Sequence, residues 1–506
     1  MEKETSNKKA IVIGSGFSGL SAACHLAKQG FQVCVIEKNE QAGGRARLFE
    51  KQGYRFDMGP SWYWMPDVFD KFFQNFNKST SDYYDLLRLD PSYQVIFGKD
   101  DAIQLSAKLE ELKQQFEKIE VGSSKQLDKF LKDAAYKYQV GMNDLIYTSG
   151  SSISQYMNSK VLKGLFKTDL LTPFSTFARK YFSNPKLLQI IEFPVLFLGA
   201  APKDIPALYS LMNYADMQLG TWYPMGGMHK IVEAMQSLAI ELGVQFQFNC
   251  PVEKILTLKS GMAYAVQTKD KTYVADYIVA SADYEHVEQN LLDEKLRKYS
   301  NKYWNSRKLA PSCLIYYIGV KKKIKKLQHH NLFFDANMQQ HADEIYDNPN
   351  WPTQPLFYVS CPSKTDKNVA PENCENLFLL IPVATGLVDD EAIKEKYFQQ
   401  IMQRLEEHCG EAISPFIEYK RSYAQSNFIA DYNAFKGNAY GLANTLQQTA
   451  FLKPSIKSKK IKNLFYTGQL TVPGPGVPPA IISGEIVANE IAKIEKIKAK
   501  NYERAI

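Results

Sequence analysis

The hydrophobic pattern near the N-terminus predicts a strand, a helix and a second strand. Residues 10–14 form a short apolar run rich in β-branched side chains, which is typical of a buried parallel strand. Residues 18–29 place their apolar side chains on one helical face, and Gly30 stands where a glycine commonly ends a helix. Residues 31–37 return to a strand-like run. We therefore expect a βαβ unit.

The remaining patterns change several times along the chain. Helical patterns with interleaved aromatic and lysine residues dominate residues 70–214. Later stretches predict an amphipathic helix at 226–243, strands at 244–258, 313–320, 377–384 and 463–469, and a last helix at 476–494. Because βα character returns at the C-terminus, the N-terminal unit is predicted to belong to a discontinuous lobe.

A chain of 506 residues is longer than one typical core, so we predict an α/β protein of two lobes. We assign residues 1–70, 215–290 and 436–506 to a Rossmann-like nucleotide-binding lobe. The two insertions, 71–214 and 291–435, are expected to form a second, α+β lobe.

Composition and charge exclude some classes of protein. The chain is 45% hydrophobic, 13% aromatic and 23% charged, which argues against disorder. Its net charge of +7 and pI of about 8.7 suit an anionic surface better than a dedicated nucleic-acid site. Since zinc-finger spacing and stacked-aromatic RNA motifs are also absent, nucleic acid is not an expected partner.

The cysteines and histidines do not predict a metal site. All seven cysteines are scattered without a C-x-x-C pair, which favours unpaired thiols in a reducing compartment. The seven histidines are scattered too, and the adjacent His329 and His330 are expected to point apart on any regular element.

The N-terminal residues 1–9 are polar and contain no apolar signal core. No apolar stretch approaches the ~18 residues that a membrane-spanning helix needs. We therefore expect a cytoplasmic protein that is able to lie on a membrane surface.

The sequence "GSGFSG" carries the first functional prediction. Its G-x-G-x-x-G spacing allows a tight turn, close approach of the backbone to a pyrophosphate and close packing of helix on strand. The helix N-terminus then offers N–H groups and a positive dipole end to phosphate, and Glu37 at the end of the second strand suits ribose hydroxyls. The candidate residues are Gly14, Ser15, Gly16, Phe17, Ser18, Gly19, Glu37 and Lys38.

Two further motifs help to choose between NAD and FAD. The "GGRAR" segment, with Gly44 and Arg45, resembles the second signature of the FAD-containing amine-oxidase superfamily, in which the arginine balances pyrophosphate charge. The "FDMGPSWY" segment, with Gly59 and Pro60, resembles the segment that runs beside the flavin in that superfamily. The resemblance implies FAD and a GR2-type FAD-binding lobe.

The chain as a whole resembles the bacterial phytoene desaturases, which are carotenoid desaturases of this superfamily. Supporting segments span nearly the full length, among them "WYPMGGMHKIVEAM", "YNAFKGNAYGL" and "NLFYTGQLTVPGPGVPPAIISGE". Val472 and Pro479 stand where the family often has histidine and glycine, which bears on fine specificity and not on the cofactor. By resemblance, Gly468, Gly476 and Val477 lie near the flavin, and Val252 presents its backbone to the adenine.

The resemblance implies FAD-dependent desaturation of phytoene towards lycopene or a partly desaturated intermediate. A hydride leaves an allylic CH2–CH2 unit for the flavin and a proton is lost from the neighbouring carbon. No catalytic residue is nominated, because residues 149–172 offer only Asp169 as an acid and this side chain is expected to be solvated. Oxygen or a quinone is the expected final electron acceptor, and the oligomeric state is left open.

An apolar carotenoid dissolved in lipid implies contact with a membrane surface. Residues 156–174 combine aromatic and lysine side chains, as an interfacial patch does, although an ordinary amphipathic core helix has the same pattern. The lysine runs 321–326 and 453–462 are interpreted as solvated loops, with attraction to anionic lipid as the alternative. The expected location is cytoplasmic, peripherally associated with the membrane.

Three other functions stay open. Another carotenoid desaturase or isomerase, or a flavin amine oxidase, would keep the same class of enzyme. The escort proteins that carry prenylated GTPases share the fold without flavin chemistry, but intact Gly14, Gly16, Gly19, Glu37 and Arg45 argue against a relative without a cofactor.

Overall fold

The computed structural model describes residues 8–150, 172–196, 198–445 and 447–503. Within these residues, five parallel strands form the first sheet in the order β19-β13-β1-β2-β9. The strands are β1 (Lys9–Ile13), β2 (Gln32–Ile36), β9 (Gln245–Gln247), β13 (Tyr277–Ala280) and β19 (Leu464–Tyr466). Segments far apart in the sequence therefore share one sheet, as the recurring βα pattern predicted.

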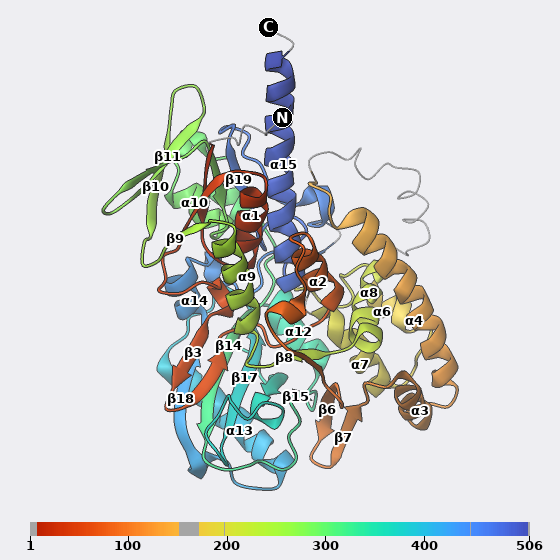
Figure 1. Ribbon diagram of the computed structural model, residues 1–506. Helices are drawn as coiled ribbons and strands as arrows, with labels where there is room; N and C mark the ends of the chain where they lie inside the picture. The colour runs from red at the N-terminus through yellow and green to blue at the C-terminus, as the bar shows by residue number, and fades with distance from the viewer. Residues whose placement is uncertain (1–7, 151–171, 197, 446, 504–506) are drawn as a thin grey trace.

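Three helices accompany this sheet: α1 (Phe17–Lys28), α9 (His229–Glu241) and α15 (Val477–Glu503). Helix α15 lies beside α1 and its C-terminal end rises above the body of the protein (Figure 1). Small residues allow this close approach, because a Cβ on Gly484 would lie 2.3 Å from the carbonyl oxygen of Ser18. The contact holds the N-terminal and C-terminal parts of the chain together.

A mixed sheet of seven strands fills the opposite half of the molecule in the order β18-β14-β17-β16-β15-β6-β7, counted over the described residues. Its strands are β6 (Tyr93–Gly98), β7 (Asp101–Leu105), β14 (Ser312–Val320), β15 (His330–Phe333), β16 (Phe357–Ser360), β17 (Glu375–Val383) and β18 (Ile417–Tyr423). Strand β14 lies inside the sheet with every residue buried, which explains the continuous apolar run in its sequence.

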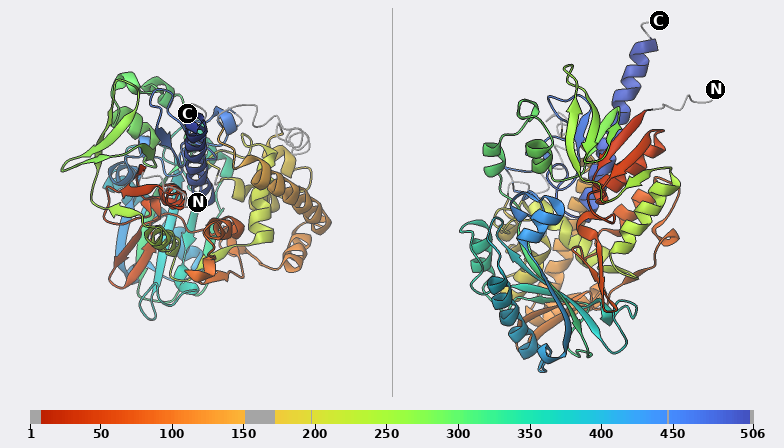
Figure 2. Two further views of the ribbon diagram at one scale, coloured as in Figure 1. Left: turned by 45° about the horizontal axis from the view of Figure 1, so that its top comes forward. Right: turned by 90° about the vertical axis from the view of Figure 1, so that its left-hand side faces the viewer.

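The remaining strands form smaller sheets, and several of the remaining helices gather on one side. The strands are β3 (Leu48–Lys51), β4 (Tyr54–Asp57), β5 (Leu86–Arg88), β8 (Trp222–Pro224), β10 (Val252–Thr257), β11 (Ala263–Thr268) and β12 (Thr272–Val274). The helices are α2 (Pro66–Gln74), α3 (Leu109–Ile119), α4 (Ser123–Val140), α6 (Phe174–Ala178), α7 (Pro185–Leu196), α8 (Leu211–Tyr214), α10 (Tyr284–Asn290), α11 (Asn301–Asn305), α12 (Met338–Tyr346), α13 (Glu391–Cys409) and α14 (Gln425–Tyr432). Figure 2 shows α3, α4, α6, α7 and α8 gathered into a helical region beside the two sheets.

The predicted α/β fold is confirmed, with one local difference. The stretch 70–214 is not helical throughout, because β5, β6 and β7 occupy parts of residues 86–105. Strand β6 adds in parallel to β15, so this segment completes a sheet whose other strands come from 291–435. The proposed division into two lobes remains a proposal, which this strand arrangement supports.

The structure can also be compared with the expectations for the cysteines, for two adjacent histidines and for a membrane-spanning helix. The seven cysteines are unpaired, and five of them are buried. The rings of His329 and His330 do not point apart, since their centroids lie 4.4 Å from each other. The prediction failed because β15 begins at His330, so the alternation of a strand does not apply to His329. In the described parts of the chain, no helix is both long and apolar enough to cross a bilayer.

Candidate functional site

A single cavity of about 490 Å³ connects the two halves of the molecule. One end is lined by the glycine-rich turn, the end of β2 and the first residues of α15. The other end is lined by apolar and aromatic side chains from the seven-stranded sheet, α7 and α12. We call these the nucleotide end and the apolar end.

The glycine-rich turn has the clearances that a bound pyrophosphate requires. A Cβ on Gly19 would lie 2.1 Å from the carbonyl oxygen of Gly14, so only glycine allows α1 to begin so close to β1. A Cβ on Gly16 would meet nothing within 4 Å, and Gly16 lines the cavity. The first residues of α1 and α15, Phe17 and Val477, both line the nucleotide end, so two positive helix ends converge on it.

Glu37 is buried at the nucleotide end and is held in a fixed orientation. One carboxylate oxygen accepts hydrogen bonds from the backbone N–H and the hydroxyl of Ser15, both at 2.8 Å. The other accepts from the backbone N–H of Asn39 at 2.9 Å and from its side-chain amide at 3.0 Å. A carboxylate fixed in this way suits the hydroxyls of a ribose, whereas Ser15 is engaged by Glu37 and does not line the cavity.

Arg45 belongs to the "GGRAR" loop, at the point where this loop touches the glycine-rich turn. A Cβ on Gly44 would lie 3.3 Å from Cα of Gly16, so the "GGRAR" loop touches the glycine-rich turn. The Arg45 guanidinium donates to the carbonyl oxygen of Asn438 at 3.1 Å, and its buried Nε has no hydrogen-bond partner among the described residues. Burial lowers the pKa of Arg45, while Asp283 opposes that shift. A half-buried guanidinium with an unused donor in this position fits a phosphate group.

Fourteen of the sixteen residues predicted from the sequence line this one cavity. The exceptions are Ser15, which binds Glu37, and Gly19, whose role lies in packing. The side chain of Lys38 donates to the carbonyl oxygen of Ala430 at 2.7 Å and so turns towards residues 430–433. The residues that line the cavity are Gly14, Gly16, Phe17, Ser18, Glu37, Lys38, Gly44, Arg45, Gly59, Pro60, Val252, Gly468, Gly476 and Val477. Their contact with FAD remains a proposal.

Sequence reasoning missed several residues of the nucleotide end. Asp283 lies at the carboxyl end of β13, where it caps α10 and stands close to Arg45. Its position directly after a buried parallel strand was a signal that could have found it. Tyr432 was not detectable in this way, because its ring reaches Arg45, at 5.1 Å, from a helix almost 400 residues later in the chain.

The apolar end is built from side chains that the chain brings together from distant segments. It includes Trp62, Phe193, Leu332, Tyr358, Leu380 and Tyr440. Among the described lining residues, the Asp, Glu, Lys and Arg side chains all belong to the nucleotide end: Glu37, Lys38, Arg45, Asp283 and Asp431. The apolar end can therefore desolvate a hydrocarbon chain without leaving an unpaired charge beside it.

Two further expectations from the sequence concern an acidic residue with its neighbouring surface patch, and a metal site. Asp169 and most of the patch at 156–174 are outside the described residues. No group of three or more His, Cys, Asp or Glu side chains in the described part of the chain could hold a metal ion.

Comparisons with known proteins agree with these features. The family described as flavin-containing amine oxidoreductase matches residues 17–492. A carotenoid 3,4-desaturase of Haloarcula japonica is 40% identical over 489 residues, which cover 96% of this chain and 99% of that protein. A zeta-carotene-forming phytoene desaturase of Myxococcus xanthus is 30% identical over 499 residues, covering 97% of this chain and 95% of that protein.

A solved structure has the same overall fold. An oxidoreductase from Methanosarcina mazei superposes with a TM-score of 0.63 and covers 95% of this chain and 100% of its own. At 15% identity, this likeness shows the fold alone.

Proposed function

Because the chain belongs to the flavin-containing amine oxidoreductase family, and is thus an FAD-dependent oxidoreductase, we propose that it is a carotenoid desaturase acting on phytoene. The product is lycopene or a partly desaturated intermediate. The observation that carries the proposal is the single cavity that joins the nucleotide end to an apolar end.

In this proposal, different residues of the cavity hold the cofactor and the carotenoid. When FAD is bound, it supplies the acceptor for a hydride. Gly16, Glu37 and Arg45 hold the pyrophosphate and ribose at the nucleotide end, while the apolar end surrounds the carotenoid and excludes water. Gly59, Pro60 and Ser61 line the cavity beside Trp62, so this segment is the natural place for the reacting CH2–CH2 unit.

A second candidate is desaturation of a different carotenoid at its 3,4 bond. The relative from Haloarcula japonica favours it, because its 40% identity exceeds the 30% of the phytoene desaturase from Myxococcus xanthus. Both candidates need the same cavity and the same hydride and proton transfers, and they differ in which part of the polyene reaches the flavin.

The remaining alternatives have less support. An amine oxidase must bind an ammonium group, and the described lining of the apolar end offers no carboxylate to it. An escort protein without flavin chemistry does not agree with the family or with the unused donor of Arg45 at the nucleotide end.

Pigment formation in bacteria tests the proposal. We expect cells that accumulate phytoene to turn yellow to red when they express this chain, because each desaturation lengthens the conjugated polyene. Identification of the pigments by chromatography then gives the number of steps. Unchanged phytoene together with conversion of lycopene would favour 3,4-desaturation, and unchanged pigments in both kinds of cell would contradict carotenoid desaturation.

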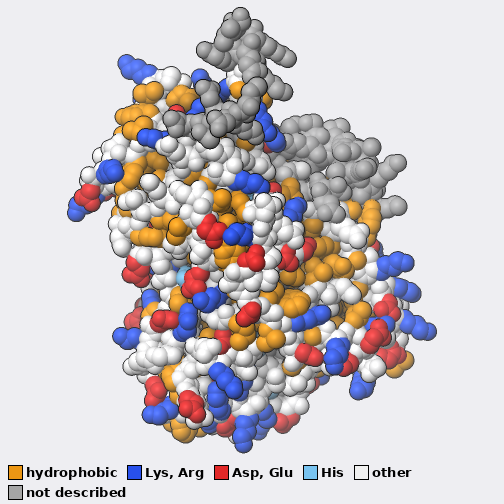
Figure 3. Space-filling model, in the orientation of Figure 1, with side chains coloured by type: hydrophobic (Ala, Val, Ile, Leu, Met, Phe, Trp, Pro, Cys, Tyr) orange, Lys and Arg blue, Asp and Glu red, His pale blue; other side chains and the backbone are white. Residues whose placement is uncertain are grey.

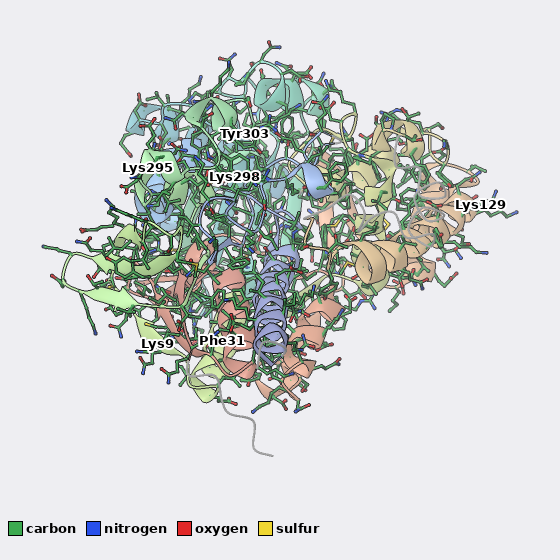
Figure 4. All side chains as sticks on the ribbon, turned by 90° about the horizontal axis from the view of Figure 1, so that it is seen from above. Lys9, Phe31, Lys129, Lys295, Lys298 and Tyr303 are labelled. Atoms are coloured by element: carbon green, nitrogen blue, oxygen red, sulfur yellow. The ribbon has the colours of Figure 1, made fainter. Side chains whose placement is uncertain are left out.

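We also propose that the protein meets its substrate at an anionic membrane surface and passes electrons to oxygen or a quinone. Lysines at the surface support the contact: the exposed Lys295 and the half-buried Lys298 lie together on one side of the molecule, and the exposed Lys129 lies at the far end of the helical region (Figure 4). Lys459 and Lys460 adjoin the first pair. Figure 3 shows hydrophobic side chains at the surface around α2 and its neighbouring helices. Flotation with anionic liposomes at low salt is expected, and a protein that stays in the soluble fraction would contradict the contact.

A further inference from the structure

We propose that Tyr358 and His330 form the relay that receives the proton lost by the substrate. The inference rests on the proposed desaturation, which requires a proton to leave the carbon next to the hydride donor. It assigns a catalytic role to the Tyr358 hydroxyl and a positioning role, with proton storage, to His330.

The Tyr358 side chain lies in the cavity beside the segment expected to border the flavin. It projects from β16 and lines the cavity together with Ser61 and Trp62. Burial raises the pKa of Tyr358, and the hydroxyls of Ser360 and Ser61 partly oppose that rise. The phenol is therefore protonated, and Tyr358 lines the cavity in which the substrate is proposed to react.

His330 stands directly behind this phenol. Its Nδ1 lies 2.6 Å from the hydroxyl oxygen of Tyr358, and its Nε2 is buried without a hydrogen-bond partner in the described part of the chain. Burial and the neighbouring His329 keep the pKa of His330 well below its usual value. With the proton of the neutral ring on Nε2, Nδ1 accepts a hydrogen bond from Tyr358 and is free to take its proton.

The indole ring of Trp62 stabilises the positive charge that His330 acquires when it takes the proton. The indole ring stacks on the imidazole with centroids 4.1 Å apart and planes 13° from parallel. A protonated imidazole over an indole face is stabilised by the ring quadrupole, and most strongly where water is excluded. His341, which also lines the cavity, is less suited as the base, because its Nδ1 accepts from the backbone N–H of Leu356 and its Nε2 pairs with the carbonyl oxygen of Pro382.

The step balances in atoms and electrons. One C–H bond of the substrate breaks with both electrons, which leave as hydride to FAD, so an allylic cation remains. The neighbouring C–H bond then breaks, its electron pair forms the new double bond, and its proton goes to the oxygen of Tyr358. The original hydroxyl proton of Tyr358 moves to Nδ1 of His330. A weak base suffices because an allylic cation is a strong acid. The proton returns when reoxidation by oxygen or a quinone consumes it.

Replacing each member of the pair tests the relay. Tyr358→Phe removes only the hydroxyl, and His330→Phe keeps an aromatic ring against Trp62. We expect either substitution to lower kcat by about 100-fold with little change in KM, since general acid–base catalysis contributes factors of this size. The double variant should be no slower than either single variant, because one relay is lost in all three. Tyr397→Phe is the matched control, since Tyr397 is a buried tyrosine of α13 that donates to the carbonyl oxygen of Pro352 and does not line the cavity.

The assay uses FAD-loaded protein with phytoene and, separately, lycopene in liposomes, and bound FAD and melting temperature are recorded for each variant. Single variants within about threefold of wild type, losses that multiply in the double variant, or an equal loss in Tyr397→Phe would overturn the relay. If wild type converts a carotenoid and Tyr358→Phe does so equally well, only the relay fails. If wild type converts neither carotenoid, the proposed function fails and the relay falls with it.

Discussion

Gly19→Ala is expected to yield a destabilised protein that retains little FAD. The added Cβ would lie 2.1 Å from the carbonyl oxygen of Gly14 and 3.0 Å from the hydroxyl of Ser281, so α1 must move away from β1. Overpacking against backbone should lower the free energy of unfolding by about 3 kcal/mol. Because the same movement opens the glycine-rich turn, the yellow flavin absorbance of the purified protein should fall with the melting temperature.

Gly16→Ala is the matched comparison within the same motif. Gly16 has φ −69°, which alanine adopts without strain, and its Cβ would meet no protein atom within 4 Å. We expect a melting temperature of the FAD-free protein close to wild type, and weaker FAD binding because the methyl group enters the space for the pyrophosphate. Unchanged FAD affinity in Gly16→Ala would contradict the placement of the pyrophosphate at this turn.

The second large effect is expected from Ala342→Trp, which should stop desaturation while FAD stays bound. Ala342 lies on α12 and lines the apolar end, so an indole there would occupy the space of the polyene. Displacing the reacting carbons by even one ångström is worth about 100-fold in rate, and we expect at least that loss. The measurement is product formation per bound FAD.

Gln340→Trp is the control on the same helix, because Gln340 is exposed and does not line the cavity. It should keep near wild-type activity, with a change in stability of about 0.5 kcal/mol or less. Equal activity of Ala342→Trp and Gln340→Trp would show that the carotenoid does not use the apolar end.

The sequence predicted the nucleotide end better than the apolar end. Local spacing identifies Gly14, Gly16 and Gly19, because a tight turn before a helix leaves a local pattern. The apolar end has no such pattern, since Trp62 and Tyr358 are far apart in the chain and become neighbours, with ring centroids 5.5 Å apart, only in the folded protein. Their apolar and aromatic character is also what any buried core requires.

Two failures have specific physical causes. Residues 93–105 form strands inside a stretch predicted to be mostly helical, because pairing of β6 with β15 decided their conformation. His330 was dismissed as one of two histidines that point apart, whereas its hydrogen bond with Tyr358 and its stacking on Trp62 depend on the start of β15. A sequence does not fix the residue at which a strand begins closely enough to foresee either contact.

The central claim is that one cavity brings a carotenoid to the flavin. The most direct measurement mixes the FAD-loaded protein with phytoene in liposomes without oxygen and follows the flavin absorbance near 450 nm, roughly the usual flavin band. The account predicts bleaching of this band together with the appearance of a more desaturated carotenoid, and loss of both in Ala342→Trp. A flavin band that stays unbleached with phytoene, together with phytoene and lycopene that are both recovered unchanged, would contradict it.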